Sequence, residues 1–215
     1  VPDPVTFVAI IAVAFAGLVT LADIGNAVWS RSRAMQESIA QATVFIFVQS
    51  RQRIGALIVH FGIILIAAGM IASGLIQSVH TVAMRIGDRV EAGGYTVTLR
   101  ELADTDGPNY DARTARFSVS QDGALLAELA PENRFYTVRG IATTEVAIRS
   151  VLRGDLYIVM GDESGDGTVV ARIFWNPLVA WIWLGWMVLL IGALMSLSKS
   201  DRRAFATKKP MAPVV

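Results

Sequence analysis

The sequence contains no cysteine, only two histidines and few charged residues. Without cysteine the chain can form no disulfide, no thiol redox centre and no cysteine-based zinc site. Charged residues make up 17% of the 215 residues, whereas 53% are hydrophobic. Soluble domains usually carry about 25% charged residues. The composition, with a mean hydropathy of +0.51, therefore predicts a membrane protein.

The few charges are also balanced, at a net charge of +1. This balance gives no indication of a nucleic-acid partner. The first residues contain neither Met nor a basic segment, so we do not expect the opening apolar run to be a cleavable signal peptide.

Three apolar runs are long enough to cross a hydrocarbon core about 30 Å thick as helices. The predicted domains are span 1 at residues 1–29, a connection at 30–53, span 2 at 54–78, an inserted domain at 79–176, span 3 at 177–198 and a basic tail at 199–215. The connection contains a short apolar segment, for which an interfacial helix is a better interpretation than a fourth span.

The positions of the basic residues predict the orientation of the spans. The connection carries four Arg against the single acid Glu37, and the tail carries five basic residues against Asp201. The positive-inside rule places both segments in the cytoplasm, and the inserted domain with the N-terminus on the exported side. The inserted domain has ten Arg, no Lys and fourteen acidic residues, which agrees in sign.

The inserted domain shows the period-two alternation of β-strands. Tyr95, Val97 and Leu99 alternate with Thr96 and Thr98, and glycine-containing turns separate such segments. About seven or eight short strands are expected. The predicted fold class is an integral membrane α-helical protein with three transmembrane helices and an inserted antiparallel β-sandwich or barrel domain. The domain lacks the motifs of known catalytic sites, so no catalytic residue is predicted.

His60 is the one residue in the spans that calls for a chemical explanation. It lies about 10 Å along the helix from Arg53, a depth at which an ionisable group is costly without a partner. A neutral imidazole there could bind a metal or haem iron, relay protons, or donate a hydrogen bond to a neighbouring helix. The glycines Gly55, Gly62 and Gly69 recur every seven residues and leave one face open to another helix or a flat macrocycle.

The other histidine, His80, cannot share one iron with His60. Twenty helical residues would separate the two by about 30 Å. A second axial ligand must therefore come from another chain or from a segment outside this sequence. We expect His80 to be a solvated residue at the exported boundary.

Five segments in order resemble the C-terminal part of CcmF, the haem lyase subunit of cytochrome c maturation. They are RQRIGALIVHFG (51–62), PENRFY (131–136), TTEVAI (143–148), DLYIV (155–159) and NPLVAWIWLGW (176–186). The resemblance covers about residues 50–200, whereas residues 1–50 match only in hydropathy.

The resemblance implies that His60 is an axial ligand of a transmembrane b haem, with the second ligand from another chain or a missing segment. In the family this haem is thought to reduce the iron of a haem delivered by the CcmE chaperone. The implied partners are an upstream CcmF half, CcmE-like and CcmH-like proteins, apocytochrome c and the lipid bilayer. Pro131, Glu132, Arg134 and Tyr136 are carried over as a signature without assigned chemistry, and pairing of Glu132 with an Arg is expected.

The implied location is the bacterial inner membrane, with the β domain periplasmic, or an organellar inner membrane. The family's tryptophan-rich segment and its other histidine ligands lie upstream of the matched region, so the chain is not expected to be catalytic alone. It is either one part of a split haem lyase or a non-enzymatic accessory or scaffold subunit in which His60 is structural. A transporter is less well supported, because the spans show no pair of broken helices.

Overall fold

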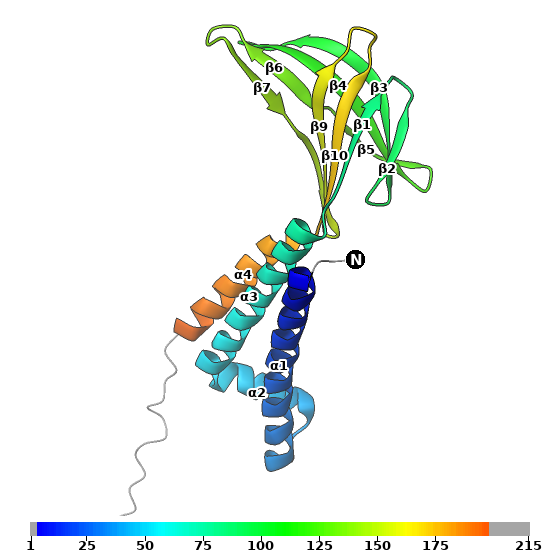
Figure 1. The fold of residues 1–215 in the computed structure, drawn as a ribbon. Coiled ribbons are helices and arrows are strands. Elements are labelled where there is room, and N and C mark those ends of the chain that lie inside the picture. Colours follow the sequence, from blue (N-terminus) through cyan, green and yellow to red (C-terminus); the bar gives the residue numbers. More distant parts are fainter. Residues whose placement is uncertain (1–3, 198–215) are drawn as a thin grey trace, which may run out of the picture. The chain divides into compact units, whose positions relative to one another are not determined.

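The computed structural model describes residues 4–197, which divide into two compact units. The helical unit comprises Ile10–Ala67 and the described residues from 183 onwards. The β unit comprises Ala68–Ile182 and the described residues before Ile10. Figure 1 labels the elements of both units except β8.

Four helices are present in the described part of the chain, namely α1 (Pro4–Met35), α2 (Ile39–Gln49), α3 (Arg51–Leu75) and α4 (Val179–Leu197). By length and composition, α1, α3 and α4 could each cross a membrane, whereas α2 is a shorter apolar helix. Ser38 caps α2 in a capping box with Gln41, which satisfies backbone N–H groups that the first turn leaves free. The three predicted transmembrane helices are thereby confirmed as elements of the fold.

The helix ends differ from the predicted domain limits. Helix α1 continues to Met35, and α3 begins at Arg51, because arginines can extend their charged ends from the last turns of a membrane helix. At its other end α3 stops at Leu75, and Ser78 already belongs to a strand. Residue 198, the predicted tail at 199–215 and residues 1–3 lie outside the described residues.

The glycine face of α3 is occupied by α4. In the helical unit, a Cβ built on Gly62 would lie 2.7 Å from the backbone nitrogen of Leu189, and one built on Gly185 would lie 2.7 Å from the backbone oxygen of Gly62. Gly55 and Gly192 make the same kind of close approach. Small residues that let two backbones meet are typical of membrane helix interfaces. The sequence allows another helix or a flat macrocycle on this face, and in the structure it is the helix α4.

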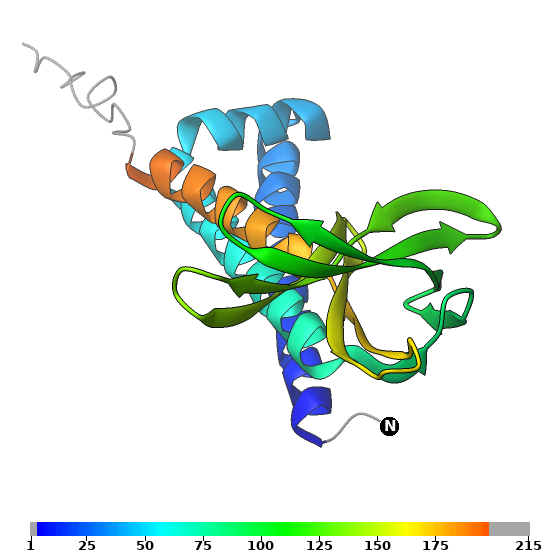
Figure 2. The ribbon, with the colours of Figure 1, turned by 90° about the horizontal axis from the view of Figure 1, so that it is seen from above.

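The described residues of the β unit form ten strands. They are β1 (Ser78–Met84), β2 (Arg89–Ala92), β3 (Tyr95–Asp106), β4 (Asp111–Gln121), β5 (Ala124–Leu129), β6 (Glu132–Tyr136), β7 (Ile141–Glu145), β8 (Ala147–Val151), β9 (Gly154–Glu163) and β10 (Val169–Pro177). One sheet has the order β1-β10-β9-β8 and the other the order β2-β3-β4-β6-β7, with β5 also paired to β4. All pairings are antiparallel, and the two curved sheets enclose a common interior (Figure 2).

The interior is built from alternate residues of both sheets, as the sequence pattern predicts. Val97 and Leu99 of β3 and Phe117 of β4 are fully buried, and Leu156 and Ile158 of β9 pack in the same core. Burial of these side chains is the main force that holds the two sheets together. The predicted antiparallel β-sandwich or barrel domain is confirmed.

The structure has ten strands and not the predicted seven or eight. Two stretches that the sequence pattern shows as continuous are divided where the pairing passes to another strand or sheet. Strand β4 pairs with β5 near its end and with β6 near its start. Strands β7 and β8 are separated only by Val146, yet they belong to different sheets. A hydrophobic alternation indicates which face of a strand is buried, but it does not indicate where the neighbouring strand changes.

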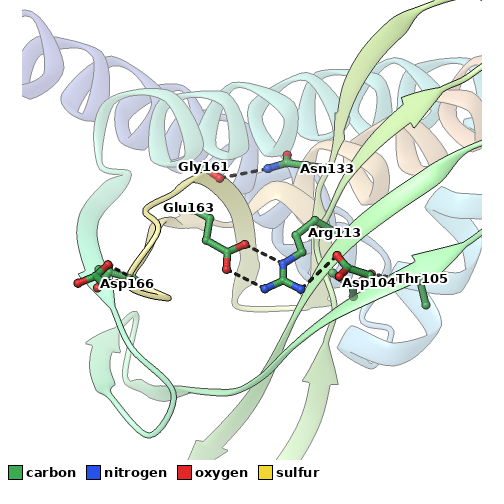
Figure 3. Close-up of polar contacts among 9 residues, drawn as sticks. Asp104, Thr105, Arg113, Asn133, Gly161, Glu163 and Asp166 are labelled. Carbon is green, nitrogen blue, oxygen red and sulfur yellow. Dashed lines mark hydrogen bonds and ion pairs between the residues drawn. The ribbon is translucent and has the colours of Figure 1, made fainter.

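A polar group links the two sheets at one end of the β unit (Figure 3). Arg113 of β4 donates two hydrogen bonds of 2.7 Å to Glu163 of β9, and a third of 3.1 Å to Asp104 of β3. Next to it, the Asn133 side chain of β6 donates to the Gly161 backbone oxygen of β9 at 3.1 Å. Bidentate arginine–carboxylate pairs are geometrically specific, so these contacts fix how the sheets meet.

The Arg113–Glu163 pair predicts a pH-dependent stability of the β unit. The hydrogen bond from Arg113 lowers the pKa of Glu163 below its usual value of 4.5. Because the pKa is lowered by folding, the contribution is complete above about pH 4.5 and is lost as the pH falls through the folded value. We expect Glu163→Gln to cost about 1 kcal/mol at neutral pH and to flatten the acid limb of the stability curve. Amide hydrogen exchange over β4 and β9 measures both effects.

Glu101→Gln provides a matched control, because the Glu101–Arg116 pair is exposed and joins neighbouring strands of one sheet. This control should leave the acid limb as in the wild type. Equal pH slopes for the wild type and Glu163→Gln would contradict the expected role of the link.

Candidate functional site

His60 lies on α3 within the helical unit, with an exposed side chain. Its Nδ1 atom is 2.7 Å from the backbone oxygen of Ala56, one turn earlier. A carbonyl oxygen can only accept, so Nδ1 carries the proton and donates it. In the neutral ring the lone pair is therefore on Nε2, which has no hydrogen-bond partner among the described residues.

The exposed imidazole is on the side of α3 opposite the α4 interface. Gly62 is two residues from His60 and Gly69 nine, which correspond to turns of about 200° and 180° around the helix. The tight glycine face and the histidine face are therefore separate. A macrocycle bound by His60 would meet the face of α3 that α4 leaves open.

The arrangement at His60 fits an axial ligand. Metal-bound histidines usually donate their other ring N–H to a carbonyl or carboxylate, which fixes the tautomer and the ring orientation. Here Nδ1–H is held by Ala56 and Nε2 is free to bind iron. Among residues 4–197 no group of three or more His, Asp or Glu could hold a metal ion. The donor set at His60 thus fits one ligand to a haem iron.

His80 is in a different setting from the one the sequence predicts. Helix α3 ends at Leu75, and His80 lies in strand β1, where it is half-buried and opposite Ile173 of β10. The separation of about 30 Å assumed that one helix connects the two histidines. It does not apply, because His80 is in a strand. His60 and His80 belong to separate units.

The signature residues of PENRFY come together with part of TTEVAI on the β6–β7 hairpin. Glu132 and Glu145 are directly opposite in the two strands, where their like charges would repel. Arg134 neutralises both carboxylates, at 2.8 Å from Glu132 and 4.0 Å from Glu145. Its guanidinium also lies 4.4 Å from the centre of the Tyr110 ring. The expected pairing of Glu132 with an arginine is confirmed. Tyr110 in turn contacts the ring of Tyr136, at 5.5 Å between centroids.

This charged cluster is partly exposed, and its electrostatics are those of a stable ion pair. The hydrogen bond to Glu132 raises the pKa of Arg134 above its usual value, so the guanidinium stays charged at every pH of interest. A permanently charged, paired arginine cannot act as an acid or a base. The cluster therefore orders the hairpin, and the fourth signature residue, Pro131, is buried beside it.

The helical unit also contains a polar cavity that the sequence does not reveal. The cavity has a volume of about 360 Å³ and is lined by residues of α1, α2 and α3 and of the link between the last two helices. Its lining residues are Asp23, Asn26, Ala27, Ser30, Arg31, Ile46, Ser50, Arg53 and Ile54. In the sequence these arginines indicate only the orientation of the spans. Contacts between residues so far apart along the chain leave no local pattern.

Comparison with known proteins identifies the relatives of this chain. Residues 75–177 match the family model described as the CcmF C-terminal beta-sandwich. The cytochrome c-type biogenesis protein ccl1 of Rhodobacter capsulatus is 37% identical over 142 residues, which are 66% of this chain and 21% of that protein. CcmF of Escherichia coli is 30% identical over 159 residues, 74% of this chain and 25% of its own length. A solved structure of the cytochrome c heme lyase CcmF matches with a TM-score of 0.58 at 18% identity, over 84% of this chain and 34% of that one.

The fold and these matches define a chain with three helices able to cross a membrane and an inserted β-sandwich, similar to cytochrome c-type biogenesis proteins. The chain belongs to the CcmF family and corresponds to its C-terminal part. The matched segment spans only about a quarter or less of the curated relatives. Its membrane helices and its bacterial relatives support a location in a bacterial inner membrane.

Proposed function

We propose that this chain is the C-terminal portion or a split subunit of a CcmF-like haem lyase, in which His60 supplies one axial ligand to a transmembrane b haem. The observation that carries the proposal is the hydrogen bond from Nδ1–H of His60 to Ala56, which leaves Nε2 as a free lone pair on the exposed face of α3. When bound, such a haem supplies one-electron redox chemistry.

The residues of this chain would hold and orient that group. The Ala56 carbonyl accepts the Nδ1–H bond, which directs Nε2 outward as the ligating atom and restricts rotation of the ring. The α4 interface fixes α3 from the opposite side through Gly62 and Gly185, so the ligand is carried by a rigid helix. An axial ligand on a packed helix is better positioned than one on a loop.

The second axial ligand would come from upstream CcmF spans, on a partner chain or on another segment of the same protein. The curated relatives extend far beyond the matched segment, and the face of α3 that carries His60 is exposed among the described residues. Upstream spans that covered this face would enclose the haem and remove a polar side chain from lipid contact. CcmE-like and CcmH-like proteins and apocytochrome c are the further partners of this proposal.

The β unit would lie on the periplasmic side as a platform for the haem chaperone or the apocytochrome. Because the chain has no cysteine, single cysteines report its orientation without background. Asp122→Cys, in the β4–β5 turn, should react with a membrane-impermeant maleimide in intact spheroplasts. Glu37→Cys, between α1 and α2, should react only after lysis. The reverse pattern would contradict the proposed orientation.

The experiment that tests the haem proposal is haem analysis of the His60→Ala variant, purified together with its partner chains. Loss of the b haem supports the proposal, and unchanged bound haem overturns it. The alternative is a non-enzymatic scaffold subunit with a structural histidine. One observation favours this alternative. The Ala56 carbonyl accepts a hydrogen bond from one ring nitrogen within the same helix, so this nitrogen needs no second chain and no haem.

A further inference from the structure

The polar cavity of the helical unit is lined in part by Arg53 of α3. Among residues 4–197, the side chain of Arg53 makes neither a hydrogen bond nor an ion pair. Arg31 differs, because it is 3.1 Å from Glu37 and its guanidinium lies 3.3 Å from the centre of the Phe45 ring. Its Nε atom is nevertheless buried without a hydrogen-bond partner. The cavity therefore offers a free cation and an unused donor.

We propose that this cavity binds the propionate carboxylates of the haem held by His60, with Arg53 as the main ionic partner. The inference rests on the proposed haem ligation. Charged carboxylates near the hydrocarbon need a paired cation and additional donors. Arg53 provides the cation, and Asn26, Ser30 and Ser50 provide neutral donors in the same lining.

The geometry of α3 connects the cavity with the ligand. Arg53 and His60 are seven residues apart, which corresponds to two helical turns within about 20° of the same direction. The two side chains therefore leave α3 on one face, about 10 Å apart along its axis. Helix α1 runs beside this face, since a Cβ built on Gly17 would lie 3.8 Å from Ile64. A haem ligated by His60 would therefore lie on the face of α3 from which Arg53 extends.

Asp23 is the one acid among the nine lining residues, against Arg31 and Arg53. Because Arg31 is already paired with Glu37, Arg53 is the cation that remains for an anionic oxygen ligand. A phospholipid headgroup has the same phosphate or carboxylate chemistry and could also bind basic residues at this depth. The shared face of Arg53 and His60 favours the propionates. The two occupants differ in their effect on the haem, because only a propionate is covalently linked to the macrocycle.

Redox titration of the purified assembly tests the inference. In Arg53→Gln the propionates lose their neutralising cation, so the ferric state gains stability and the midpoint potential of the haem should fall. The haem should also bind about tenfold more weakly, the equivalent of one charge-assisted hydrogen bond. Arg53→Lys should restore most of both properties. Arg51→Gln is the matched control, because Arg51 donates to the Val48 backbone oxygen and does not line the cavity.

The outcomes separate this inference from the proposed function. A lowered potential in Arg53→Gln, with a normal potential in Arg51→Gln, supports it. If Arg53→Gln keeps the wild-type potential and haem affinity while His60→Ala loses haem, the inference about the propionates is overturned and the ligation by His60 stands. If Arg53→Gln then also loses bound phospholipid, the cavity binds a lipid headgroup. Haem retention in His60→Ala overturns both. If Arg53→Gln loses haem completely, retention in Arg53→Lys supports the inference and loss in Arg53→Lys overturns it.

Discussion

Replacing His60 by alanine is expected to remove nearly all b haem from the assembly of this chain with its partners. An axial imidazole supplies an iron–nitrogen bond that neither alanine nor the bilayer can replace. The haem content per protein, measured by the pyridine haemochrome method, should fall at least about tenfold, the effect of losing one strong ligand interaction. Added imidazole should restore part of the bound haem, because the space left by the side chain admits a free ligand.

His80→Ala is the matched control for this experiment. The second histidine is half-buried in strand β1, and the structure gives it no role at the His60 site. His80→Ala should keep the wild-type haem content. Equal haem content in His60→Ala and the wild type would leave the scaffold interpretation as the better account.

Leucine at Gly62 is expected to disrupt the interface between α3 and α4. A Cβ at this position would lie 2.7 Å from the backbone nitrogen of Leu189 and 2.8 Å from the backbone oxygen of Gly185. Backbone atoms cannot rotate away, so the two helices must separate. We expect a loss of at least about 3 kcal/mol of stability, the upper end of the cost of overpacking. Thermal unfolding in detergent, followed by circular dichroism, measures it.

Gly74→Leu controls for the general effect of a larger residue in α3, because a Cβ at Gly74 meets nothing within 4 Å. This variant should unfold within a few degrees of the wild type. If Gly62→Leu were as stable as Gly74→Leu, the close helix contact would be wrong, and with it the assignment of separate faces for packing and for haem.

The transmembrane helices could be predicted from the sequence because hydropathy depends on composition over about twenty residues. Their ends could not. Helix α3 contains Arg51 and Arg53, which hydropathy assigns to the connection, and it stops at Leu75 because the chain enters strand β1 at Ser78. The hydrogen bonds of β1 with β10, made by residues almost a hundred positions away, decide this boundary. No local pattern contains that information.

The candidate site, like the helices, could be predicted from the sequence only in part. A histidine inside a membrane span is recognisable from sequence, since an ionisable group there is costly. Its useful geometry is set by Ala56, whose contribution is a backbone carbonyl and not a side chain. The cavity joins Asp23 and Asn26 of α1 to Arg53 of α3, and it exists only after the helices have packed. Orientation and cavity shape are tertiary properties, whereas residue identity and depth are sequence properties.

The most direct test of the central claim is exchange of the ligand itself. His60→Met keeps a possible axial ligand but replaces the imidazole nitrogen by a thioether sulfur. Low-temperature electron paramagnetic resonance of the oxidised assembly should show the haem retained with altered g-values, and its midpoint potential should rise. A haem with wild-type g-values and potential in His60→Met would show that its iron is bound elsewhere, and would contradict this account.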